Sequence, residues 1–406
     1  MSESVAGAAR GPGEVVGPGA ERMADALARA FVLWRSRNYA RRREAITTIA
    51  HSAGYSVATL DNSIDALLKP FTAEALNTFA AQISVSGRTD RPKTIGFIAA
   101  GNVAGAGIHE IAIALIAGAH VIVKTASAEP IFFAQFARTL AEIDPDAAAR
   151  IEVLHWSRAR IDLTAALIAK CDRVVVYGDD LTIESLHRPN VIGFGSRVSA
   201  AVVAGGAIIP SRIDALAEAL ARDVALFEQL GCLSPHEVFV VSSAEGAARA
   251  LAVRMSAALE SLGKSMPPAR IPVSDASQVR AVRERARWRA IAGEPVELFE
   301  GRALEWTLVF EPRGALHDSF RISPGFRTVH VTAVRNLVEF RQRVESVAGR
   351  IEAMAVAGDE SEAAEIRATL ATIGIPYVCA PGEMQSPPLD WRHGGGAFLD
   401  LMVGRR

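Results

Sequence analysis

Hydrophobic positions along the chain alternate between short uninterrupted runs and longer stretches with helical spacing. Ile95–Ala100 and Val121–Val123 are short apolar runs, and Ile108–Ala117 between them has the composition of an apolar helix. Short runs of this kind are typical of strands buried on both faces. Two such strands joined by a helix form a βαβ unit of a parallel sheet. We therefore expect the first sheet to form around Thr94–Pro130.

The same alternation runs through most of the chain. Apolar positions recur at helical spacing from Ala20, and helical stretches reach Ile83 before the polar linker Ser84–Lys93. Strand and helix patterns then alternate to Phe194, and a second alternating region begins near Gly231. This order predicts doubly wound parallel sheets. Further strands are expected at 151–154, 173–177, 191–194, 237–241, 304–310, 328–334 and 377–379, and helices at 130–143, 161–170, 213–230, 244–262, 274–292, 337–344 and 360–373.

The pattern divides the chain into four parts. Residues 1–20 are rich in glycine, alanine and proline and lack the basic start and apolar core of a signal peptide, which predicts a disordered tail. Residues 21–230 hold N-terminal helices and a first α/β domain, and residues 231–375 hold a second one. Residues 376–406 form a closing segment in which a loop with proline, tryptophan and glycine precedes a short apolar end.

Charge and cysteine content narrow the classes of function. The 406 residues carry a net charge of -1, which argues against nucleic-acid binding and against attraction to a membrane surface. The apolar run Val198–Pro210 is too short to span a bilayer. Three widely spaced cysteines, Cys171, Cys232 and Cys379, exclude a disulfide framework and suit a reducing cytoplasm.

The turn after the first strand carries polar candidates. Gly101, Gly105 and Gly107 permit a close backbone approach, and the following helix offers free N–H groups to an anion. The dinucleotide pattern Gly-x-Gly-x-x-Gly is not met, so a bound nucleotide and a turn without ligand both stay open. The Asn102 amide can donate to an oxyanion or hold its own turn. Lys124 ends an apolar strand, where its charge needs a phosphate or ribose, or a carboxylate partner.

Cys232 stands between a helix end and a strand at the expected domain junction. It is a candidate nucleophile, although a lone cysteine is commonly a small buried hydrophobe. His236 is a candidate base, with packing as its more ordinary role. His393, next to Trp391 and three glycines, either closes over a substrate or lies on the surface. The sequence lacks zinc, serine-hydrolase and Walker patterns, so we expect no metal centre.

Four segments together resemble the aldehyde dehydrogenase superfamily. They are Gly101–Val103 in the glycine turn, Val121–Thr125 ending in the lysine, Val176–Asp179 and Gln229–Pro235 around the cysteine. Within that superfamily the chain most resembles the LuxC-type acyl-CoA reductases, through Trp34–Arg43 with Gly54-Tyr55, Arg327–Val331, Gly382–Gln385 and Pro387–His393. The resemblance covers nearly all of the chain after residue 20.

This resemblance implies an aldehyde dehydrogenase-like α/β fold, with two doubly wound α/β domains and the active site in the cleft between them. It implies that Cys232 is the nucleophile and that the Asn102 amide and the Cys232 backbone N–H hold the oxyanion. The nicotinamide cofactor is then expected on the domain of residues 21–230. The expected cofactor-binding residues are Ala100, Gly101, Lys124, Thr125, Ser127, Gly178 and Asp179.

Two departures from the superfamily pattern bear on the chemistry. Phe194 stands where oxidising members carry the glutamate that activates the deacylating water. An acyl-enzyme without that base survives longer and can be reduced. Ser127 stands where members that prefer NAD often carry a glutamate on the adenosine ribose, which favours NADPH over NADH. Glu129 is close enough in sequence to oppose this preference.

The implied activity is the NADPH-dependent reduction of an acyl thioester to an aldehyde through an acyl-cysteine intermediate. The substrate is acyl-CoA or an acyl group bound to a carrier or synthetase protein, and a homo-oligomer in the cytoplasm is expected. Two alternatives stay open. One is an aldehyde dehydrogenase that forms an acid or acyl-CoA, and the other is a non-catalytic scaffold with the same fold. The acyl chain itself is not specified by these motifs.

Overall fold

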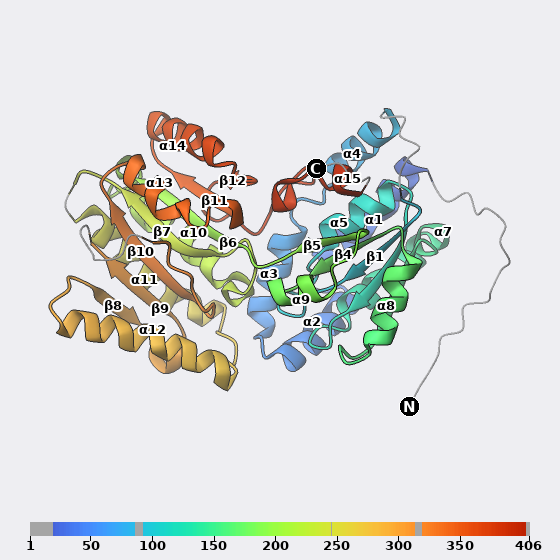
Figure 1. Ribbon diagram of the computed structural model, residues 1–406, viewed down its shortest axis with the longest axis horizontal. Coiled ribbons are helices and arrows are strands. Elements are labelled where there is room, and N and C mark those ends of the chain that lie inside the picture. Colours follow the sequence, from blue (N-terminus) through green and yellow to red (C-terminus); the bar gives the residue numbers. More distant parts are fainter. Residues whose placement is uncertain (1–18, 86–91, 245, 313–318, 403–406) are drawn as a thin grey trace.

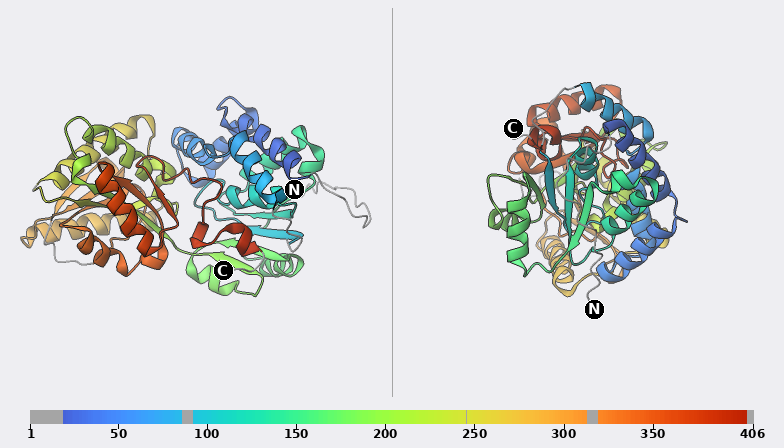
Figure 2. Two further views of the ribbon diagram at one scale, coloured as in Figure 1. Left: turned by 90° about the horizontal axis from the view of Figure 1, so that it is seen from above. Right: turned by 90° about the vertical axis from the view of Figure 1, so that its right-hand side faces the viewer.

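The computed structural model describes residues 19–85, 92–244, 246–312 and 319–402, so most of the expected N-terminal tail lies outside the described residues. The chain forms two α/β lobes that lie side by side along the long axis of the molecule (Figures 1 and 2). Each lobe is built on its own sheet, one with the strand order β3-β2-β1-β4-β5 and the other with β12-β11-β6-β7-β10-β9-β8.

The first sheet is entirely parallel, as the βαβ pattern predicts. Successive residues of a strand point to opposite faces, and β1 and β4 divide their apolar side chains in this way. Phe97 and Val175 join the core under the N-terminal helices, whereas Ile98 and Val176 pack beneath α8. The strands are β1 (Thr94–Ile98), β2 (His120–Thr125), β3 (Ile151–His155), β4 (Arg173–Tyr177) and β5 (Val191–Phe194).

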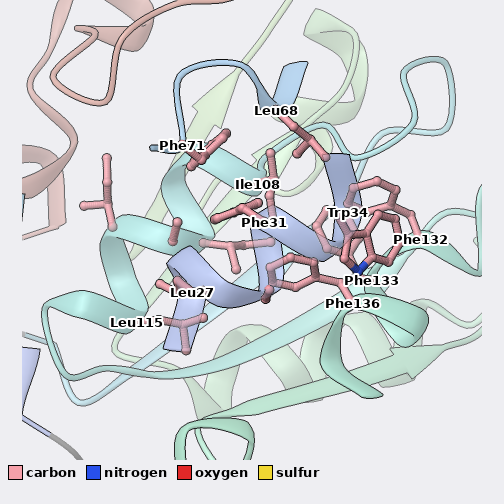
Figure 3. Close-up of a cluster of buried hydrophobic side chains, with 14 of the residues drawn as sticks. Leu27, Phe31, Trp34, Leu68, Phe71, Ile108, Leu115, Phe132, Phe133 and Phe136 are labelled. Carbon is pink, nitrogen blue, oxygen red and sulfur yellow. The ribbon is translucent and has the colours of Figure 1, made fainter. Parts of the chain in front are cut away.

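Helices cover both faces of this sheet. They are α1 (Ala20–Arg35), α2 (Ala40–Ala53), α3 (Val57–Leu68), α4 (Ala73–Val85), α5 (Ile108–Ile116), α6 (Phe132–Ile143), α7 (Pro145–Ala148), α8 (Ile161–Lys170) and α9 (Asp180–Ser185). An aromatic cluster ties α1 to α5 and α6 (Figure 3). Phe31 stacks on Phe71 with ring centroids 4.2 Å apart, and the Trp34 indole donates to Thr139 Oγ1 at 3.0 Å. Each buried ring contributes about 1.5–3 kcal/mol, so the N-terminal helices are an integral layer of the lobe.

The second sheet is parallel except at β8, which is antiparallel to β9. Its strands are β6 (Val198–Ala204), β7 (Pro235–Val241), β8 (Glu297–Glu300), β9 (Thr307–Glu311), β10 (Thr328–Val334), β11 (Ile351–Ala357) and β12 (Tyr377–Cys379). Helices α10 (Ile213–Ala225) and α11 (Ala247–Ser265) pack on one face, and α13 (Leu337–Glu345) and α14 (Glu360–Ile373) pack on the other. Helix α12 (Val273–Ile291) covers the β8–β9 edge.

The sequence prediction placed the start of the second domain too late. The chain enters the second sheet at β6, and α10 packs there as well, so residues 198–224 belong to the second lobe and not to the first as expected. Ala225, Leu226 and Phe227 are buried in the core of the first lobe. The same prediction missed β6, β8 and β11. Strands β6 and β11 are alanine-rich, and alanine gives little strand signal although both strands are almost wholly buried.

The closing segment connects the two lobes. It leaves the second sheet at β12 and ends in α15 (Phe398–Met402), whose Phe398 and Met402 are buried in the core of the first lobe. Figure 1 shows this segment returning across the gap between the sheets to end beside α5. His393 lies on this crossing, within the short helical turn His393–Gly395, which places it between the lobes.

Candidate active site

A cavity of about 1310 Å³ lies at the carboxyl ends of the first sheet's strands and is closed by the second lobe and the closing segment. Ligands of doubly wound sheets bind at this strand edge. Eight of the nine residues predicted for the site line this cavity: Ala100, Gly101, Asn102, Lys124, Ser127, Gly178, Asp179 and Cys232. The exception is Thr125, which is fully buried and directs its hydroxyl to Leu154 O and His155 Nδ1 on β3.

Cys232 follows an unusual turn in the chain. Helix α10 ends at Ala225, five residues before the predicted end, and Phe227, Glu228 and Gln229 then adopt φ values of 50°, 52° and 60°. Left-handed backbone costs a non-glycine residue about 1–2 kcal/mol, so this turn must be held by other contacts. It replaces the last helical turn that the sequence pattern predicts.

Buried polar side chains hold the turn. Arg327 donates to both Glu228 carboxylate oxygens, at 2.9 and 2.7 Å, and both side chains are almost fully buried. The Gln229 amide donates to Pro235 O and Thr328 O and accepts from the Thr328 backbone N–H. These bonds offset the backbone strain and fix the direction of the chain as it enters Gly231 and Cys232.

The Asn102 amide lies beside this loop. Its Nδ2 donates to Leu230 O at 2.7 Å, and its backbone carbonyl accepts from the Tyr55 hydroxyl at 2.7 Å. A carboxamide nitrogen carries two N–H groups, so one remains for a ligand oxygen. The structure thus brings Asn102 and Cys232, which are far apart in sequence, to one wall of the cavity.

His393 is a site residue that the sequence left open, and the structure overturns the interpretation that it lies on the surface. It is only 6% exposed, and its Nδ1 is 2.6 Å from Glu110 Oε1 on α5. Burial favours the neutral imidazole, but Glu110, the Cys232 side chain and Glu352 together raise the pKa of His393 to about 10. Despite burial, the same pairing holds the pKa of Glu110 at about 2. The pair is therefore ionised at neutral pH.

Aromatic rings fix the His393 imidazole on both sides. Phe194 stacks on it with centroids 3.9 Å apart and planes at 4°, and Trp391 stacks with centroids 4.2 Å apart. Phe194 occupies the position where the superfamily glutamate was expected, and its ring is used here for packing. His236 also lines the cavity, but its Nδ1 accepts from the Ser323 backbone N–H and burial lowers its pKa to about 4. His236 is therefore a neutral packing residue.

Two cations lie at the other end of the cavity. Lys124 and Arg158 both line it, and in the part of the chain that the structure describes neither makes an ion pair or a side-chain hydrogen bond. Burial and the nearby Arg158 charge lower the pKa of Lys124. Glu129 does not supply the missing anion, because it is buried and its Oε1 accepts from the Phe132 backbone N–H at 2.7 Å. This end of the cavity can therefore accept an anionic group.

The neighbouring backbone is suited to an extended ligand. A Cβ at Gly101 would come within 3.1 Å of Ala126 Cβ and 3.2 Å of Ala128 Cβ, so a side chain here would push the two loops apart by a few tenths of an ångström. Gly178 and Asp179 also line the cavity, and Asp179 caps α9 by accepting from the Thr182 N–H. The Thr182 hydrogen bonds and the Arg158 charge lower the pKa of Asp179. The donor set of Lys124, Arg158 and Ser127 fits the phosphorylated adenosine half of a dinucleotide.

The described residues hold no group of three or more metal-ligating side chains arranged to bind a metal ion, and none of their helices is long and apolar enough to cross a membrane.

The fold defines a class of protein. The chain superposes on an aldehyde dehydrogenase 21 from Physcomitrella patens, crystallised with succinate, with a TM-score of 0.68 at 14% identity over 95% of this chain and 84% of that one. An oxidoreductase from Marinobacter aquaeolei gives 0.66 at 16% identity over 96% and 85% of the two chains. The fold is thus that of the aldehyde dehydrogenases, as expected.

Sequence comparison gives the family within this class. The model of the acyl-CoA reductase (LuxC) family matches residues 18–405, and the chain belongs to that family. Two of its relatives, each 25% identical to it over the matched residues, illustrate the family. The long-chain acyl-protein thioester reductase of Aliivibrio fischeri matches over 51% of this chain and 47% of its own length, and that of Photobacterium phosphoreum matches over 51% and 46%. The chain therefore spans about half the length of the curated relatives it matches.

Proposed function

We propose that this protein reduces an acyl thioester to an aldehyde through an acyl group carried on Cys232. The observation that carries the proposal is the placement of Cys232, Asn102 and His393 on one cavity that is also lined by Lys124 and Arg158, neither of which makes an ion pair among the described residues. A thiolate in such a site attacks a thioester carbonyl, and a nearby amide donor stabilises the oxyanion that forms. Membership of the acyl-CoA reductase (LuxC) family supports the same chemistry.

Residues of this chain account for each role. The Cys232 sulfur forms the bond to the acyl carbon, and the free Asn102 N–H donates to the carbonyl oxygen as it becomes negative. Phe194 and Trp391 fill the space around His393, and Phe194 supplies no carboxylate to activate water for hydrolysis. The acyl-enzyme is thereby kept for reduction.

We propose NADPH as the cofactor. When bound, it supplies hydride to the acyl carbon. Lys124 and Arg158 would hold the phosphate on its adenosine ribose, next to Ser127 where a carboxylate would repel it. The sequence left Glu129 as an objection to NADPH, but this carboxyl is buried outside the cavity lining and burial raises its pKa to about 8, so it puts no negative charge against the phosphate at neutral pH.

The acyl donor is proposed to be held by a protein, with acyl-CoA as the other source. The curated relatives are named for acyl-protein thioesters, which favours a carrier or synthetase partner here as well. A homo-oligomer, the cytoplasm as the location and the absence of nucleic-acid partners stay proposals from the sequence.

The test is product stoichiometry with acyl-CoA and with an acylated carrier protein. We expect one aldehyde and one free thiol for each NADPH oxidised, with no fatty acid, and no turnover by Cys232→Ala. Cys379→Ala is the matched control, because Cys379 lies on the edge strand β12 away from the cavity. Acid as the main product, or NADP⁺ reduction with aldehyde and water, would instead indicate an oxidising enzyme.

A further inference from the structure

The proposed function as stated gives the buried pair of His393 and Glu110 no chemical role, and the geometry points to one. Glu110 comes from α5 in the first lobe, and His393 comes from the closing segment, 283 residues later. Their contact exists only when the closing segment crosses the cavity. A second carboxylate on β11, Glu352, accepts from the Gly394 backbone N–H at 3.1 and 3.2 Å and fixes that crossing.

The hydrogen bond to Glu110 determines which ring nitrogen is available. Nδ1 is committed to the carboxylate, and the stacked rings of Phe194 and Trp391 prevent the imidazole from turning over. Nε2 is therefore the nitrogen left for another partner. The Cys232 side chain interacts with this same imidazole and contributes to its raised pKa.

The charges around the imidazole favour its protonated form. Glu110 and Glu352 face it, with Glu352 also within 3.8 Å of Arg197 Nε. The Tyr177 ring stacks near it, and burial together with the Glu110 charge raises the pKa of Tyr177, so that hydroxyl stays neutral. His109 lies beside the group, but burial lowers its pKa and its Nε2 contacts Pro387 O at 2.9 Å. His393 is thus the cation among these groups that lies against the sulfur.

We propose that His393 is a catalytic residue that pairs as an imidazolium with the Cys232 thiolate and then protonates the sulfur of the departing thiol. Glu110 is the positioning residue that holds the proton on the imidazole. The inference rests on the proposed function, because it concerns the acylation of Cys232 by a thioester.

The step balances as follows. The Cys232 thiolate forms a bond to the acyl carbon, and the bond from that carbon to the donor's sulfur breaks with its electron pair going to the sulfur. The donor's sulfur takes the proton from His393 Nε2, which leaves a free thiol, a neutral imidazole and acyl-Cys232. A solvent proton then recharges the imidazole. After hydride addition, the oxyanion collapses to the aldehyde and expels the Cys232 thiolate, which the imidazolium stabilises. The sum consumes one proton for each aldehyde formed.

The pairing also accounts for reduction in place of hydrolysis. A protonated imidazole cannot accept a proton from water, and Glu110 is occupied by its hydrogen bond to the ring. Phe194 stacks on the imidazole and occupies the sequence position where the superfamily base was expected. Once a solvent proton has recharged His393, no neutral imidazole is left to activate water beside the acyl-enzyme, and Glu352 is engaged with the Gly394 N–H.

The test separates proton donation from packing by changing the leaving group. Single-turnover acylation without cofactor is measured by intact mass, with an alkyl thioester and with a nitrophenyl thioester whose thiolate leaves without protonation. We expect His393→Gln to slow acylation by the alkyl thioester about 100-fold, the lower range for a lost general acid, and to change the nitrophenyl reaction less than about fivefold. Glu110→Gln should show the same split with a smaller loss. His330→Gln, a buried histidine outside the cavity, is the matched control and should leave both rates unchanged.

A second readout is the rate of Cys232 alkylation by iodoacetamide at neutral pH. The rate should be lower in His393→Gln than in the wild type, because the variant lacks the imidazolium that stabilises the thiolate, and His330→Gln should keep the wild-type rate. Equal losses on both thioesters, or wild-type rates in His393→Gln, would overturn the proposal while leaving acyl transfer to Cys232 intact. Failure of the wild-type protein to form any acyl adduct would instead overturn the proposed function.

Discussion

At the scale of single residues, the motifs pointed to Cys232 and Asn102 as site residues but not to the pair of His393 and Glu110. Cys232 and Asn102 stand in short local segments that resemble the superfamily, and both line the cavity. Glu110 lies inside an apolar helix and His393 inside a glycine loop, so neither has a local signal. Only the folded chain brings these two together, and there each partner's charge and hydrogen bond shift the pKa of the other against the effect of burial.

The oxyanion role of Asn102 gives a prediction at this scale. Asn102→Ala should lower kcat about 100-fold with KM nearly unchanged, because the lost N–H donates mainly to charge that develops in the transition state. Steady-state kinetics with one acyl thioester measures both constants. Asn77→Ala is the control, since Asn77 is exposed on α4. A rise in KM with unchanged kcat would contradict the oxyanion role.

At the scale of elements, the alternating pattern predicted most strands and helices, and it failed where long-range contacts decide the backbone. Strands β6 and β11 carry alanines that gain strand structure from burial between neighbours. The left-handed turn before Cys232 follows an uninterrupted helical pattern, and the bonds that hold it come from residues a hundred positions away. No local pattern contains those partners.

This turn should depend on the buried Arg327–Glu228 pair. Arg327→Met leaves the Glu228 carboxylate buried without its partner, and removal of one member of such a pair costs about 3–5 kcal/mol. Urea denaturation measures the free energy of unfolding. The double variant Glu228→Gln with Arg327→Met should recover part of the loss, because no charge remains buried. A loss below about 1 kcal/mol in the single variant would show that the pair does not hold the turn.

Glu129, at the start of α6, gives a prediction on pH. Burial raises the pKa of this carboxyl to about 8 in the folded protein, against an ordinary value of 4.5. A raised folded pKa means that the stability is complete below the unfolded pKa and is lost as pH rises through the folded one. Glu129→Gln keeps the acceptor for Phe132 N–H and cannot ionise. The variant should match the wild type at about pH 4 and exceed it by several kcal/mol, up to about 5 kcal/mol, at pH 9, as measured by denaturation. Parallel pH profiles of the two proteins would contradict this.

At the scale of the whole molecule, the cavity has two ends with different chemistry, and two lobes and one crossing segment form it. The first lobe supplies the cations and the amide, the loop beside the second sheet supplies the cysteine, and the closing segment supplies the histidine. The sequence predicted the two lobes and the cleft. It placed their boundary too late, because β6 enters the second sheet ahead of the motif that marks the cysteine.

The cation end of the cavity gives a prediction on ligand choice. Arg158→Ala should weaken binding of NADPH about tenfold and leave NADH binding nearly unchanged, because only NADPH carries the ribose phosphate that this side chain would meet. Fluorescence of the bound reduced nicotinamide measures both dissociation constants without turnover. Arg188→Ala, an exposed arginine away from the cavity, is the control. Equal weakening of both cofactors would contradict a phosphate contact.

The most direct test of the central claim is the mass of the protein after reaction with an acyl thioester and no cofactor. The account predicts the addition of one acyl group, mapped to Cys232, absent in Cys232→Ala and present in Cys171→Ala and Cys379→Ala. On addition of NADPH, the mass should return to that of the free protein with one aldehyde released for each protein. No adduct with any acyl thioester, or an adduct that survives in Cys232→Ala, would contradict the account.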